Sequence, residues 1–154
     1  MTDNIKYHFL KSEFVPLLRT LKADQKGIWG TMNAQQMVEH FADSVKIANG
    51  RLQQPIIHEG EHLNKLREFL MSDIPFKENT KNVLLPEVPE QAKKESMSAS
   101  IDYLQEQLDH FFKVNEETAE LKTDNAFFGS LNLEQNIQLL YKHAKHHLKQ
   151  FGIE

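Results

Sequence analysis

Apolar residues recur along most of the chain every three or four positions, which is the spacing of one face of an α-helix. Runs of β-branched residues, which favour strands, are nearly missing. Pro16 fits the first helix because it lies near the first turn, where its missing N–H costs little. The pattern predicts an all-α protein with helices over residues 12–22, 33–48, 61–71, 97–115 and 132–151.

The second and the last of these helices begin with the same signal. In each, an asparagine is followed three positions later by a glutamine: Asn33 by Gln36, and Asn132 by Gln135. This is the pattern of a capping box, in which the two side chains satisfy free backbone N–H groups at the helix start. The glycine of Asn49-Gly50 ends the second helix, since glycine readily adopts the left-handed conformation that closes one.

One long connection separates the second helix from the third. It covers residues 50–95 and contains the prolines Pro55, Pro75, Pro86 and Pro89 together with the short helix. Four amphipathic helices with one long crossover are typical of a helical bundle. No internal repeat, low-complexity tract or second domain is visible in the sequence, so residues 1–154 are predicted to form a single domain.

Composition narrows the class of protein. The chain has 154 residues, 40% of them hydrophobic, and 18 basic against 22 acidic residues give a net charge of −4, which argues against a dedicated nucleic-acid binder. Cysteine is absent, which excludes disulfides, thiolate metal sites and a cysteine nucleophile. No uninterrupted apolar run exceeds three residues, so neither a membrane span nor a signal peptide is predicted. We expect a cytoplasmic protein.

Histidine is unusually frequent in this chain, with eight residues. His143 and His147 are one turn apart on the last helix, about 105° and 65° from the centre of its apolar stripe, whereas His146 falls on the opposite, solvent side. His40 lies at the flank of the apolar stripe of the second helix. Histidines at the core edge of two helices are one way in which bundles build metal sites.

Zinc, nickel and iron all accept imidazole ligands, and zinc is the first expectation. The alternative is that these residues are ordinary histidines at an amphipathic boundary, which bond a carbonyl or reach solvent. Spacing by itself leaves both interpretations open.

A rival metal motif lies in the long connection. The run His58-Glu59-Gly60-Glu61-His62 matches the His-Glu-x-x-His of zinc proteases, where two ligands share one helix and the glutamate is the general base. Gly60 in its middle and Pro55 before it favour a loop that enters a short helix, which would misalign the ligands.

Two other histidines and three lysines are predicted to lie on the solvent-exposed surface. His8, expected before the first helix, and His110, opposite the apolar stripe of its helix, are both assigned to the surface. Lys142, Lys145 and Lys149 are predicted to form a solvated stripe on the outer face of the last helix.

Several segments together resemble a bacterial family of unknown function within the DinB/YfiT-like superfamily of metalloenzymes. They are Trp29-Gly30-Thr31-Met32-Asn33, Gln36-Met37-Val38-Glu39-His40-Phe41, the stretch from Pro75 to Lys81, Phe128-Gly129-Ser130-Leu131, and the stretch from His143 to Gly152. The resemblance implies an up-up-down-down four-helix bundle with a divalent metal held by His40, His143 and His147. Some members of the superfamily resemble S-transferases or isomerases that use a low-molecular-weight thiol.

The first functional hypothesis is an enzyme. Three imidazoles leave a zinc-like ion with an open fourth position, which suits hydrolysis or a thiol-dependent S-transfer. Because the chain lacks cysteine, the thiol would arrive with the substrate. Gln36, Asp43 and Ser44 lie about one turn from His40 and are the candidates for contacts with the ligands or the substrate.

The second hypothesis is a binding or structural module in which the metal, or the histidine cluster without it, ties two helices together. A homodimeric form of this module is suggested by apolar residues in the long connection, namely Ile74, Phe76, Val83, Leu84 and Leu85.

Overall fold

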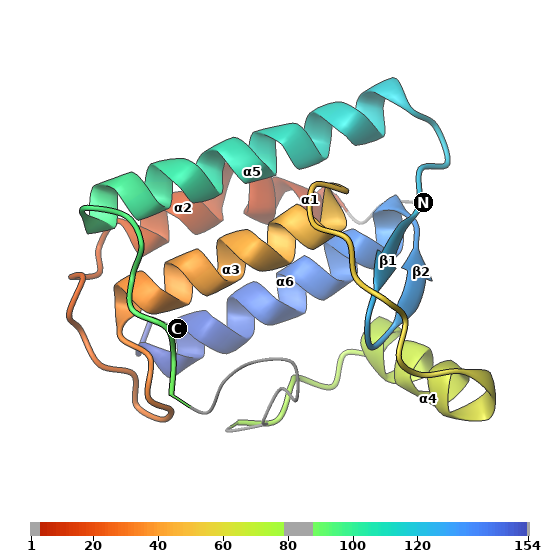
Figure 1. Ribbon diagram of the computed structural model, residues 1–154, viewed down its shortest axis with the longest axis horizontal. Helices are drawn as coiled ribbons and strands as arrows, with labels where there is room; N and C mark the ends of the chain where they lie inside the picture. The colour runs from red at the N-terminus through yellow and green to blue at the C-terminus, as the bar shows by residue number, and fades with distance from the viewer. Residues whose placement is uncertain (1–3, 79–87, 154) are drawn as a thin grey trace.

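The computed structural model describes residues 4–78 and 88–153, which form a helical bundle with one small β-hairpin (Figure 1). The helices are α1 (Asn4–His8), a π-helical turn (Phe9–Glu13), α2 (Phe14–Leu18), α3 (Ala34–Ala48), α4 (Gly60–Met71), α5 (Met97–Glu117) and α6 (Leu133–Gln150). The strands are β1 (Thr123–Asn125) and β2 (Gly129–Leu131). Among the described helices, none is long and apolar enough to cross a membrane.

Contacts between helix ends establish the direction of each helix. Lys6 Nζ donates to Gln138 Oε1 at 2.6 Å, and three residues further along each segment the ring of Phe9 lies 5.3 Å from that of Tyr141, so the N-terminal helical segment and α6 run in the same direction. Arg19, directly after α2, donates to Asp102 near the start of α5 at 2.8 Å, so α2 and α5 run in opposite directions. Figure 1 shows the same arrangement along the length of the bundle.

The second and third long helices run in the same direction. Glu39 near the start of α3 accepts from Ser100 near the start of α5, and Asn49 at the end of α3 donates to Gln107 further along α5. The order is therefore up-down-down-up, and the expected up-up-down-down order is wrong. An up-up-down-down bundle needs two long crossovers, whereas this chain has one, between α3 and α5. The two shorter connections each reverse the direction of the chain.

The N-terminal helix differs from the prediction over residues 12–22. It begins at Asn4 and ends at Leu18, and it contains a π-helical turn closed by the N–H of Phe14, which donates to the carbonyl of Phe9. His8 consequently lies inside the helical segment, at the end of α1, although it is exposed as predicted.

The π-helical turn explains why the boundary was missed. Phe9 and Leu10 are buried, and the next buried pair, Phe14 and Val15, follows at an interval of five residues instead of three or four. The extra residue shifts the phase of the apolar pattern, so the two halves of the segment do not match one helical period. Pro16 lies in α2, three residues after this wide turn and not near the start of the helical segment as predicted, and a regular helix interior would not accommodate it well.

The predicted ends of α3 and α6 are confirmed. Both capping boxes are present, with Asn33 and Gln36 paired at 2.8 Å in each direction and Asn132 and Gln135 at 2.9 Å in each direction. Gly50 follows α3 with a φ of +86°, as its role at the helix end requires.

The hairpin of β1 and β2 was not predicted. Its strands pair in antiparallel register, with Asp124 opposite Ser130, and they are three residues long, too short to show an alternating pattern. Thr123 Oγ1 donates to the carbonyl of Ala48, so the hairpin ties the end of α3 to the entry of α6.

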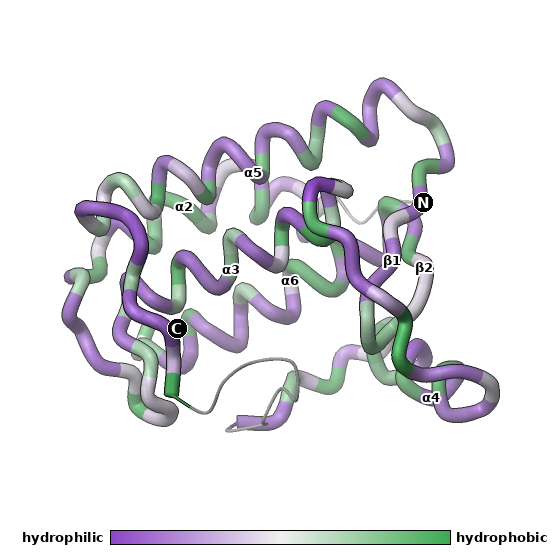
Figure 2. Tube along the Cα trace, in the orientation of Figure 1, coloured by the Kyte–Doolittle hydropathy of each residue, from purple (hydrophilic) through white to green (hydrophobic). Residues whose placement is uncertain are grey.

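The core lies between the four long helical segments of the described chain. Figure 2 shows apolar positions recurring along α3, α5 and α6, and the largest fully buried side chains include Phe14, Met37, Phe41, Leu104, Leu108 and Phe111. In the long connection, Ile74 is 61% exposed and Phe76 is half-buried, whereas Val83, Leu84 and Leu85 lie outside the described residues.

Candidate metal centre

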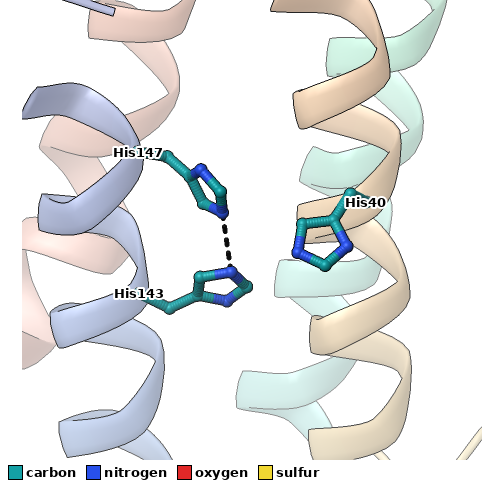
Figure 3. A group of neighbouring side chains, drawn as sticks. All are labelled: His40, His143 and His147. Carbon is teal, nitrogen blue, oxygen red and sulfur yellow. Dashed lines mark hydrogen bonds between the residues drawn. The ribbon is translucent and has the colours of Figure 1, made fainter. Parts of the chain in front are cut away.

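His40, His143 and His147 lie together between α3 and α6 (Figure 3). The ring centroid of His40 is 5.2 Å from that of His143 and 5.4 Å from that of His147. The Nε2 atoms of His143 and His147 are 2.7 Å apart. Each of the three side chains offers one nitrogen, and these nitrogens lie within 4.8 Å of one another. The structure thus brings together the three histidines that were singled out in the sequence.

The packing of Phe41 directs His40 towards α6. Phe41 is fully buried, and its ring lies 4.8 Å from the rings of both Phe14 and His143. Because Phe41 is anchored in the core, α3 cannot rotate freely about its axis, and the preceding residue His40 is held at the edge that faces α6.

Burial keeps the three imidazoles neutral. It lowers the pKa of His40 to about 4, and the charge of His146 adds to the effect. Burial, assisted by the charge of His40, lowers the pKa of His147 to about 3. The pKa of His143 is held well below its ordinary value by burial and then by the charges of the neighbouring histidines. Neutral imidazoles have the free lone pair that metal coordination requires.

Gln150 is a neighbour of the cluster that the sequence analysis missed. Its Oε1 lies 2.7 Å from Nδ1 of His147, and its Nε2 donates to the carbonyl of Trp29 at 2.9 Å. Gln150 follows His147 by three positions and is therefore on the same side of α6, which is the only sequence signal of this contact.

The three polar residues predicted near His40 have other surroundings. Gln36 uses Oε1 for the capping box, and its Nε2 donates to the carbonyl of Glu90 at 3.0 Å. Ser44 Oγ donates to the carbonyl of His40 at 3.4 Å, which is a contact within the helix backbone. Asp43 as a whole residue is exposed, but its carboxyl group is partly shielded from water by its neighbours, which raises its pKa.

The prediction that His146 faces open solvent is wrong. It is half-buried, with its ring 5.6 Å from Trp29 and 6.4 Å from Phe76. The connection before α3 and the segment after α4 cover this side of α6, which helical periodicity within α6 cannot reveal.

The His-Glu-x-x-His run has no continuous helix. Glu59 is extended, and α4 begins at Gly60, which has a φ of +62°. His58 therefore precedes the helix that carries His62, although their ring centroids are 4.6 Å apart. Among the described residues, only His40, His143 and His147 form a group of at least three histidine or acidic side chains close enough to hold an ion.

Two further surface assignments are tested by the structure. His110 is only partly exposed on α5, and Lys149 is exposed with its Nζ 3.5 Å from Glu78. Lys142 is buried, so its place in the predicted solvated stripe is wrong. Its Nζ donates to the carbonyl of Phe69 at 2.8 Å, because α4 packs over this part of α6.

The donor set fits a divalent cation of the zinc type. Two nitrogens bound at about 2.0–2.1 Å to a tetrahedral ion lie roughly 3.3 Å apart. The separations in the cluster, from 2.7 Å to at most 4.8 Å, bracket this value, so small side-chain rotations suffice. The chemistry also agrees, since neutral imidazole suits zinc, nickel and iron.

Comparison of the chain with protein-family models, with curated proteins and with solved structures returned no match. The functional argument therefore depends on the residues and geometry described above.

Proposed function

We propose that the chain is a divalent-metal-dependent enzyme of the DinB/YfiT-like kind, with His40, His143 and His147 as ligands of one ion, zinc in the first place and nickel or iron as alternatives. The observation that supports the proposal most directly is the convergence of three neutral imidazoles from two helices without a fourth histidine or acidic ligand among the described residues. Structural zinc sites usually have four protein ligands, whereas catalytic sites usually have three.

The ion, when bound, supplies Lewis acidity and one coordination position that the protein leaves open. The protein residues hold the ion and limit access of water. The ring of Phe41 lies 4.8 Å from that of His143, and the ring of His146, itself 5.6 Å from Trp29, lies 5.2 Å from that of His147, so aromatic rings pack against two of the three ligands. The reaction classes that we propose are S-transfer from a low-molecular-weight thiol and hydrolysis, and the absence of cysteine requires that any thiol come from a substrate.

The first experiment is elemental analysis of protein purified without a histidine tag. We expect about one metal ion per chain, and we expect none in a variant with His40→Ala, His143→Ala and His147→Ala. A variant with His8→Ala and His110→Ala controls for histidine loss elsewhere and should retain the ion. Absence of bound metal, even after incubation with zinc, nickel and iron, would contradict the proposal.

Turnover is the second measurement. The metal-loaded protein is assayed with pairs of a thiol and an electrophile and with hydrolysable esters and amides, beside the triple variant. Activity that is lost in the triple variant supports an enzyme, and its complete absence would leave a metal-binding module.

That module is the second candidate function. The observation that favours it is the packing of His40 on α3 against His143 and His147 on α6, with ring centroids 5.2 Å and 5.4 Å apart. In this case the cluster ties two helices together, and removal of His147 should lower the melting temperature without loss of any activity.

A further inference from the structure

The side chain of Gln150 connects the chain before α3 to the histidine cluster. Gln150 is buried, with 3% of its surface exposed, and both ends of its amide group are bonded. The carbonyl oxygen of Trp29 can only accept, so the end of the amide that faces it is the NH2 group. The orientation of the amide is thereby defined, and Oε1 faces His147.

This orientation determines which nitrogen of His147 carries the proton. An amide oxygen only accepts, so the partner atom Nδ1 of His147, at 2.7 Å, must be the donor. A neutral imidazole has one N–H, and it is therefore on Nδ1. The lone pair is on Nε2, which points towards His143.

His143 must then have the opposite arrangement in the metal-free protein. The two Nε2 atoms are 2.7 Å apart, and one of them has to donate. Since Nε2 of His147 has the lone pair, His143 supplies the Nε2 proton. His147 is thus already in the tautomer that a metal ion needs at Nε2, whereas His143 has to change its tautomer or its rotamer.

Two glycines let the chain approach Gln150 closely. A Cβ atom at Gly30 would lie 2.8 Å from Nε2 of Gln150, and one at Gly27 would lie 3.0 Å from its Cγ. The N–H of Ile28 also donates to the carbonyl of Gln150 at 2.7 Å. Residues 27–30 therefore hold Gln150 through both its backbone and its side chain.

We infer that Gln150 is a positioning residue, which sets the Nδ1–H tautomer and the ring orientation of His147 and is itself oriented by the carbonyl of Trp29. As a statement about metal affinity, the inference rests on the metal site proposed above. As a statement about the tautomer, it can be tested without a metal.

The first test is nitrogen-15 NMR of the imidazole groups in the metal-free protein. We expect the Nδ1–H tautomer for His147 and the Nε2–H tautomer for His143. Gln150→Glu keeps an acceptor for Nδ1 and should keep the tautomer of His147, whereas Gln150→Leu should change it. A wild-type His147 with its proton on Nε2 would overturn the inference, and this measurement requires no variant to fold.

The second test is zinc affinity, measured by competition with a chromophoric chelator. Gln150→Leu should weaken binding by roughly 10–100-fold, as is usual when the partner of a ligating histidine is removed. Gln150→Glu should stay within a few-fold of wild type although it loses the bond to Trp29. Circular dichroism verifies that each variant is folded.

Gln138→Leu is the matched control. Gln138 is a second buried glutamine of α6, and its Nε2 donates to the carbonyls of Leu70 and Ser72, away from the histidine cluster. The control should leave zinc affinity unchanged. If the wild type binds zinc and Gln150→Leu binds it as tightly as Gln138→Leu, only the inference about Gln150 is overturned. If the wild type does not bind zinc, the proposed function is overturned.

Discussion

Lys142 Nζ lies 2.8 Å from the carbonyl oxygen of Phe69 and 4.1 Å from the centre of the Phe69 ring. It is also within 3.4 Å of the carbonyl of Leu70 and 3.3 Å of that of Ser72. These carbonyls are at the C-terminal end of α4, where the backbone lacks intrahelical donors and the helix dipole favours a cation. One buried lysine therefore anchors α4 to α6, directly before His143.

Replacement of this lysine tests the anchor. Lys142→Met keeps most of the aliphatic stem but removes the charged donor from the carbonyls at the end of α4, so we expect a loss of about 2 kcal/mol in the free energy of unfolding, measured with urea. Lys149→Met removes an exposed lysine of the same helix and should cost less than about 1 kcal/mol. Equal losses in the two variants would show that the anchor contributes nothing.

The neutral histidines predict an acid-sensitive fold in the metal-free protein. An unfolded histidine titrates near 6.5, whereas burial lowers the pKa of His40 to about 4 and that of His147 to about 3 in the folded chain. Between these values the unfolded chain binds more protons, so stability falls as the pH drops from about 6.5 to about 4. Each such histidine contributes up to about 1.4 kcal/mol per pH unit.

Urea titrations over this pH range check the slope. His40→Gln should reduce the slope, and His8→Gln controls for the loss of an exposed histidine. An identical slope in wild type and His40→Gln would contradict the assignment of His40 as a buried neutral group.

Metal binding should stabilise the folded chain if the proposed site exists. Free zinc at about one hundred times its dissociation constant adds about 2.7 kcal/mol, which raises the melting temperature by roughly 5–10 °C in a chain of this size. His40→Ala removes one ligand but leaves the contact between His143 and His147, and its melting temperature should respond much less. A similar rise in wild type and in the variant would locate zinc elsewhere on the protein.

Gly30 offers a test of the contact between the chain before α3 and Gln150. Gly30 and Gly60 both have a positive φ, so alanine at either position costs about 1 kcal/mol in backbone strain. Only at Gly30 would the new methyl group also displace Gln150, since nothing lies within 4 Å of a Cβ at Gly60. We expect Gly30→Ala to lose about 1 kcal/mol more than Gly60→Ala in thermal or urea unfolding.

Local features of the chain could be predicted well from the sequence. The apolar period of α3, α5 and α6 and the two capping boxes depend on residues at most four positions apart, and all are present in the structure. The faces of His143 and His147 follow from the same period. The N-terminal segment is the exception, because a π-helical turn shifts its apolar pattern by one residue.

What the sequence determined by itself is therefore the set of helices, most of their ends, and the side of each helix on which a histidine lies, because short-range periodicity and capping are sufficient for these. Tertiary structure alone decided the order of helix directions, the burial of Lys142 and the contacts of Gln150. These depend on contacts between distant segments, such as Lys142 with Phe69 and Gln150 with Trp29, which are 73 and 121 positions apart. No local pattern encodes such contacts, because they form only when the packing of the core brings the segments together.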